Sequence, residues 1–135
     1  MKMTRSQRIL IVTGDAQSEA MRGALAARGF AVTTAPDYQS AYRQLLEARF
    51  ELVVIDLVEL VEGVEFIKRV QGMTNLTQPL LLVIAECGTG GATLALSQSA
   101  DAYEPKPVDA AQLADSVERL LGTKALSARG KIGAE

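Results

Sequence analysis

Short apolar runs alternate with longer amphipathic stretches along the chain. Apolar runs of strand length lie at residues 8–12, 30–35, 51–57, 80–85 and 100–104. Apolar residues recur at a helical period in five intervening or following stretches, residues 17–28, 37–48, 64–70, 92–99 and 109–121. Runs without polar interruptions are typical of strands that helices cover on both faces. The pattern predicts an α/β protein in which strands and helices alternate strictly.

Strict alternation favours a parallel sheet, because each strand is followed by a right-handed helical crossover to the next. The predicted fold is a five-stranded doubly wound parallel sheet, a (βα)5 three-layer α/β/α sandwich of the flavodoxin-like kind. We expect one domain over residues 6–122. Residues 123–135 lack a sustained apolar period and are expected to form a frayed C-terminal tail or the start of a linker.

Several residues predict where elements begin and end. Asp37 and Asp109 each precede an amphipathic stretch and are candidate helix N-caps. Gly29 follows the first helical stretch and suits the position just after a helix end. The segment Pro105-Lys106-Pro107 predicts a rigid turn between the last strand and the last helix.

Composition and charge narrow the function classes. The 135 residues carry a net charge of −2, so no basic surface points to nucleic acid. Histidine is absent, which excludes histidine-activated nucleophiles and histidine metal sites. The single cysteine fits a reducing compartment, and no apolar run approaches the ~18 residues of a membrane span. We expect a cytoplasmic protein with no membrane contact.

Candidate chemistry gathers where the predicted strands end, because ligands of such sheets bind beyond the carboxyl ends of the strands. Thr13, Gly14 and Asp15 follow the first strand, and Asp56 ends the third. Ile84 lies at the end of the fourth strand and Lys106 just after the fifth. Asp56 and Lys106 are the most informative pair, since each follows a buried strand.

These pieces, in this order, resemble the CheY-like receiver domain of bacterial response regulators. The resemblance covers about Ile9 to Leu121, and it rests on "RGFAVTTA", "LVVIDL", "PLLLVIA" and "YEPKP". It implies a phosphoprotein of two-component phosphorelay signalling, in which Asp56 is the phosphoacceptor and Lys106 contacts the phosphoryl oxygens. It also implies that the carbonyl of Val58 faces a metal and that Tyr103 is an aromatic switch.

The resemblance further implies partners. A sensor histidine kinase or a phosphotransfer protein would supply the phosphoryl group. A protein partner or a second copy of the chain would dock on the face made by the fourth helix, the fifth strand and the fifth helix. We expect no conventional enzyme activity.

The chain departs from the family pattern at three positions. Thr13 and Gly14 stand where the family has an acidic pair that holds Mg²⁺, which leaves Asp15 as the remaining acid after the first strand. Ile84 stands where the family has the hydroxyl that couples to the aromatic switch. Because Mg²⁺ prefers carboxylate oxygens, the sequence predicts weak or no Mg²⁺ binding and weak or no Mg²⁺-dependent phosphorylation.

Two hypotheses remain open at this point. The chain is either a phosphorylatable receiver or a pseudo-receiver that acts as a phosphorylation-independent interaction or dimerisation module. Simpler interpretations also stand beside them: Asp56 caps a turn, Lys106 pairs with Asp56 in an inert ion pair, and the glycine-rich residues 87–91 form a plain loop rather than a phosphate loop. A flavin site is disfavoured because aromatic residues make up only 4% of the chain.

Overall fold

The computed structural model describes residues 7–13, 17–56, 60–72, 79–86, 100–106 and 109–134, with only the backbone described at 17, 60–61, 86, 105–106 and 123–134. The described residues form one parallel five-stranded sheet of β1 (Arg8–Val12), β2 (Ala31–Ala35), β3 (Leu52–Asp56), β4 (Leu80–Glu86) and β5 (Ala102–Lys106). Its strand order is β2-β1-β3-β4-β5, so the order reverses between β1 and β3. The predicted doubly wound parallel sheet is confirmed.

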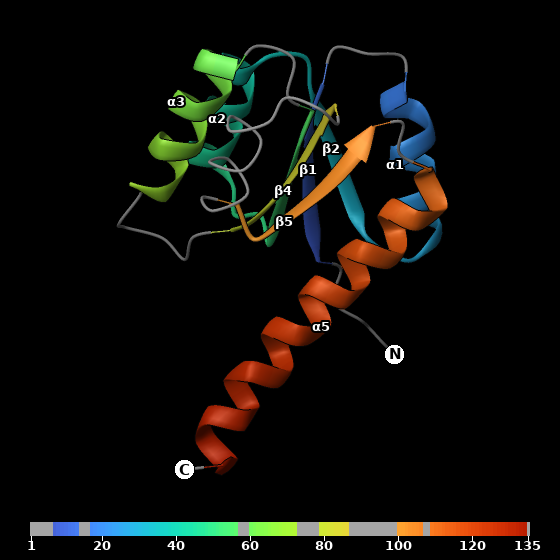
Figure 1. Ribbon diagram of the computed structural model, residues 1–135, viewed down its shortest axis with the longest axis vertical. Helices are drawn as coiled ribbons and strands as arrows, with labels where there is room; N and C mark the ends of the chain where they lie inside the picture. Colours follow the sequence, from blue (N-terminus) through green and yellow to red (C-terminus); the bar gives the residue numbers. More distant parts are fainter. Residues whose placement is uncertain are drawn as a thin grey trace.

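Helices cover both faces of the sheet (Figure 1). The helices α2 (Tyr38–Glu47) and α3 (Leu60–Gln71) lie on one face, and α1 (Gln17–Ala27) and α5 (Ala110–Ala134) lie on the other. The helix expected over residues 92–99 lies outside the described residues. In the part of the chain that is described, no helix has the length and apolar character to cross a membrane.

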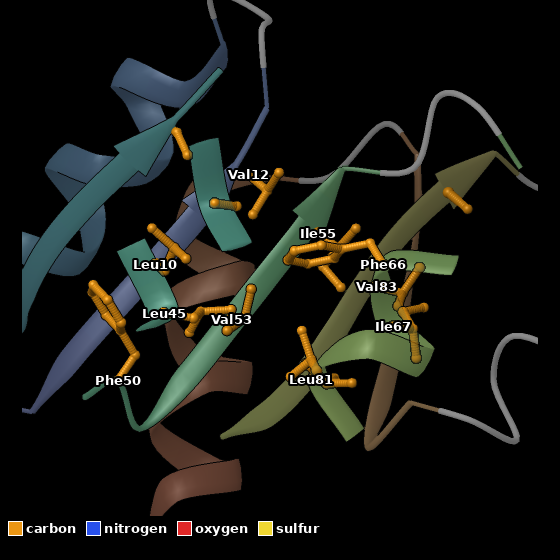
Figure 2. Close-up of a cluster of buried hydrophobic side chains, with 14 residues drawn as sticks. Leu10, Val12, Leu45, Phe50, Val53, Ile55, Phe66, Ile67, Leu81 and Val83 are labelled. Atoms are coloured by element: carbon orange, nitrogen blue, oxygen red, sulfur yellow. The ribbon is translucent and has the colours of Figure 1, made fainter. Parts of the chain in front are cut away.

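The side-chain alternation along each strand divides the core into two layers. On the central strands β1 and β3, Leu10 and Val53 face α2 and α3 and belong to the buried cluster that also holds Phe66 (Figure 2). Their neighbours Ile11 and Val54 face α1 and α5. All four of these strand residues are fully buried, as expected for strands that are covered on both faces. This doubly covered core holds the carboxyl ends of β1 and β3 side by side.

The predicted helix ends are confirmed at three positions. Gly29 has a φ of 93°, a left-handed conformation that glycine adopts without the steric penalty of a side chain, and its N–H donates to the carbonyl of Ala26 at 3.0 Å. The Asp37 carboxylate accepts a hydrogen bond from the Ser40 N–H at 2.7 Å and so caps α2. Asp109 caps α5 in the same way.

Replacing Asp37 with alanine is expected to lower the melting temperature at neutral pH, because α2 loses its cap. The hydrogen bond from Ser40 lowers the pKa of the Asp37 carboxyl below its ordinary value of 3.8. The stabilisation is therefore present above that value and is lost as the pH falls through the lower pKa of the folded state. Melting curves between neutral and acidic pH should show the difference from the wild type narrowing. An Asp37→Asn control, which keeps the acceptor oxygen, should stay close to the wild type at neutral pH; equal losses in both variants would contradict the capping role.

Three expected boundaries are wrong. The third helix begins at Leu60 rather than at Val64, so Gly63 lies inside it. Lys106 and the preceding Pro105 belong to β5 rather than to a turn. Because β5 is an edge strand, it tolerates proline, whose missing N–H need not pair with a neighbouring strand.

The last helix also differs from the expectation. Helix α5 does not end near residue 122 but continues to Ala134, so the backbone of residues 123–134 is helical rather than frayed. Figure 1 shows this end of α5 projecting past the sheet, away from the carboxyl ends of the strands. Residues 123–134 include good helix formers and no proline, which is compatible with a helical backbone there. The use of this segment as a linker stays a prediction.

Candidate functional site

The candidate site begins where the two central strands end. Val12 and Ile55 are register partners on β1 and β3, so the next residues, Thr13 and Asp56, lie at the same edge of the sheet. The N–H of Thr13 donates to the carbonyl of Ala35 at 3.0 Å, which fixes its backbone against the end of β2. Thr13 is 7% exposed and Asp56 is 6% exposed. The edge therefore holds a carboxyl group and a hydroxyl group that are almost completely buried.

The two side chains are joined by a hydrogen bond. The Thr13 Oγ1 hydroxyl donates to Asp56 Oδ2 at 2.7 Å. A carboxylate that is withdrawn from water needs such donors, because burial without them costs several kcal/mol, of the order of 2–7 for an uncharged polar group and more for a charge. The position at which the family carries a metal-binding acid is thus occupied by a neutral donor that stabilises Asp56 directly.

The described donors, Thr13 and Asp56, do not by themselves fit a receiver-type Mg²⁺ site. Mg²⁺ takes oxygen ligands in a tight octahedron and relies on carboxylates to offset its dehydration. Thr13 supplies a neutral hydroxyl in place of a carboxylate, and this hydroxyl donates to Asp56 Oδ2. The other positions expected around the metal, Gly14, Asp15 and Val58, lie outside the described residues, so their roles stay predictions.

The predicted switch residues lie in different layers. Tyr103 of β5 is partly buried in the layer under α2 and α3, and its hydroxyl donates to the carbonyl of Ala85 at 3.4 Å. Ile84 of β4 is 2% exposed and packs in the opposite layer, with the residues of α1 and α5. The structure therefore does not bring the Ile84 and Tyr103 side chains together. The hydroxyl partner of Tyr103 is a backbone carbonyl of β4.

Lys106 is placed by its backbone alone. It is the last residue of β5 and the register partner of Glu86 on β4, at the same edge of the sheet as Asp56. Its side chain lies outside the description, so contact between Lys106 and Asp56 stays a prediction.

A cavity of about 710 Å³ extends from this edge toward α2 and α3. Thr13 and Asp56 contribute to its lining, together with aromatic and charged residues of the two helices: Asp37, Tyr38, Tyr42, Glu62, Glu65, Phe66 and Arg69. This cavity was not predicted from the sequence. A signal in the sequence was missed, because the lining residues of each helix are spaced so that they lie on one face. These residues are Tyr38 and Tyr42 on α2 and Glu62, Phe66 and Arg69 on α3.

The aromatic rings of the cavity are held in defined pairs. The rings of Tyr38 and Phe66 stack across α2 and α3 with centroids 5.2 Å apart and planes inclined by 28°. The guanidinium carbon of Arg69 lies 5.6 Å from the centroid of the Tyr42 ring, which is a cation–π distance. The lining of the cavity thus includes three aromatic rings, and one of them already contacts a cation.

Comparisons with known proteins give a consistent family. No protein-family model matches the chain. It is 30% identical over 125 residues to the transcriptional regulatory protein PrrA of Mycobacterium leprae, covering 91% of the chain and 53% of that protein. It is 30% identical over 114 residues to the transcriptional regulatory protein CseB of Streptomyces avermitilis, covering 84% of the chain and 48% of that protein. The chain therefore spans about half the length of these relatives.

Solved structures agree on the fold. A response regulator from Thermotoga maritima superposes with a TM-score of 0.78 at 21% identity, covering 87% of the chain and 99% of that structure. This level of identity shows the fold alone.

Proposed function

Because the chain is a receiver domain of the response-regulator family, we propose that it is an atypical signalling module of a two-component system. Its Asp56 is the acceptor position, and we propose that Mg²⁺-dependent phosphorylation there is weak or absent. The single observation that carries this proposal is the buried hydrogen bond from Thr13 to Asp56. We also propose a cytoplasmic location, in keeping with the single cysteine.

The physical reason lies in the charge that phosphoryl transfer must balance. In the transfer, an Asp56 oxygen would form a bond to phosphorus while the bond from phosphorus to the donor breaks. Charge then spreads over the phosphoryl oxygens, and catalysis of this chemistry is mostly positioning and electrostatic stabilisation. Thr13 contributes no charge, and its hydrogen bond stabilises the carboxylate before the reaction, which lowers its nucleophilicity. Both effects oppose the reaction.

A phosphorylation-independent role is the second candidate, and the packing of Tyr103 favours it. The Tyr103 ring is already partly buried in the layer under α2 and α3, and Ile84 offers it no hydroxyl. We propose that partner contact, rather than phosphorylation, governs the surface around β5 and α5. A kinase, a phosphotransfer protein or a second copy of the chain are the partners to test.

Intact-mass spectrometry after incubation with Mg²⁺ and acetyl phosphate tests the proposal. We expect no aspartyl-phosphate adduct under conditions that fully label a receiver with an intact acidic pair, run in parallel. An Asp56→Asn variant serves as the acceptor-free control, and its partner binding should equal that of the wild type. A stoichiometric adduct on the wild type that is absent from Asp56→Asn would reject the proposal and establish an ordinary phosphorylatable receiver.

A further inference from the structure

The cavity beside Asp56 is larger than a metal site requires. Its volume of about 710 Å³ lies within the ~300–1,000 Å³ that is usual for small-molecule sites. Tyr38, Tyr42 and Phe66 form an aromatic wall on α2 and α3, and the Tyr38–Phe66 stack holds two of the rings in place. The cavity can therefore accept an organic molecule with a ring or a short aliphatic body.

The charge of the lining selects the kind of molecule. Among the described residues, four carboxyl groups line the cavity, those of Asp37, Asp56, Glu62 and Glu65, against the guanidinium of Arg69. Walls of one charge sign in a concave site concentrate ligands of the opposite sign. Anions are disfavoured by the same arrangement.

The aromatic wall adds a second attraction for positive charge. The faces of tyrosine and phenylalanine rings attract cations through the ring quadrupole. Arg69 demonstrates this within the cavity, since its guanidinium carbon lies 5.6 Å from the centroid of the Tyr42 ring. Carboxylates and aromatic rings that line one cavity are complementary to a cation with an apolar body.

We propose that this cavity binds a small organic cation, namely an ammonium group attached to an aromatic body. The ammonium lies toward the carboxyl groups of Glu62, Glu65 and Asp56, and the body lies against Tyr38 and Phe66. A lysine side chain of a protein partner has the same charge but only a narrow aliphatic stem, which leaves much of the cavity unfilled. The proposal goes beyond signalling through Asp56, because binding requires neither Mg²⁺ nor phosphoryl transfer.

An NMR titration of the full chain, without Mg²⁺ or phosphodonor, tests the proposal. The probes are phenethylammonium, 2-phenylethanol and 3-phenylpropionate, which share a phenyl ring and differ in charge. Phenethylammonium should cause saturable shifts at the amides of Tyr38, Asp56 and Phe66, with an affinity at least about fivefold above that of 2-phenylethanol. 3-Phenylpropionate should cause none.

Variants separate the cavity from general attraction to an acidic protein. A Glu62→Gln/Glu65→Gln double variant should bind phenethylammonium about two- to fivefold more weakly, and both positions are exposed, so the fold should be unaffected. Glu47→Gln is the matched control, because Glu47 is exposed on α2 and does not line the cavity. Its affinity should equal that of the wild type.

Three outcomes would overturn the proposal. They are equal binding of the three phenyl probes, an unchanged affinity in the double variant, and shifts that do not map to the cavity. A fourth arm uses butylammonium, which carries the charge without the ring. If it bound as tightly as phenethylammonium, the cavity would recognise a basic side chain of a partner rather than a small molecule, and the proposal would be wrong. None of these results depends on whether Asp56 accepts a phosphoryl group.

Discussion

Replacing Thr13 with aspartate is expected to raise the affinity of the domain for Mg²⁺ by at least about tenfold. Thr13 Oγ1 lies 2.7 Å from Asp56 Oδ2, so a carboxylate at position 13 would lie beside the first and share a bound cation with it. Unit charges about 4 Å apart interact by about 4 kcal/mol at an effective dielectric of about 20, and about 1.4 kcal/mol already gives tenfold. The remaining interaction energy offsets the free-energy cost of removing water from Mg²⁺.

The same substitution should destabilise the protein in the absence of Mg²⁺. Two carboxylates would then lie together at a site where both residues are less than a tenth exposed, without the hydrogen bond that Thr13 donates. Added Mg²⁺ should restore the melting temperature, because a ligand that binds only the folded state stabilises it. Melting curves over a Mg²⁺ titration report both effects in one experiment.

Thr13→Asn is the matched control for this prediction. Asparagine has nearly the shape of aspartate but no charge, so it should lose the wild-type hydrogen-bond geometry without gaining Mg²⁺ affinity. If Thr13→Asp and Thr13→Asn respond to Mg²⁺ alike, the neutral residue at position 13 is not what limits metal binding.

Fold prediction succeeded where burial alone decides the structure. The strand bounds Arg8–Val12 and the apolar core of β3, Leu52 to Ile55, follow from uninterrupted apolar runs, which only a doubly covered strand can bury. The predicted end of β5 was wrong because proline, considered without its tertiary context, is typical of a turn. Its tolerance in β5 depends on that strand lying at the edge of the sheet, which is a tertiary property.

The site could likewise be predicted only where the sheet itself determines the arrangement of the residues. The meeting of Thr13 and Asp56 could be predicted, because parallel strands bring their carboxyl ends to one edge whatever the side chains. The cavity could not, because it depends on how α2 packs on α3. The Tyr38–Phe66 stack joins residues on different helices, and no periodicity within either helix specifies the distance between them.

Truncating Leu82 to alanine is expected to destabilise the domain by about 2–5 kcal/mol, the usual range for a fully buried leucine. Leu82 is 0% exposed on β4 and packs in the layer between the sheet and the helices α1 and α5. It pairs in register with Val54 on β3 and Ala102 on β5, so the cavity left behind is enclosed by backbone that cannot collapse freely. Against a typical total of about 5–15 kcal/mol, this loss is a large fraction of the stability.

Urea denaturation followed by circular dichroism measures the change, with Leu46→Ala as the matched control. Leu46 is 56% exposed on α2, and alanine is at least as good a helix former, so its free energy of unfolding should stay within about 0.5 kcal/mol of the wild type. An unchanged urea slope in Leu82→Ala would show that the loss belongs to the native packing rather than to a change in the denatured state. A loss below about 1 kcal/mol would mean that the layer under α1 and α5 repacks around the missing side chain. That result would contradict the rigid packing of the doubly covered sheet that holds Asp56 in place.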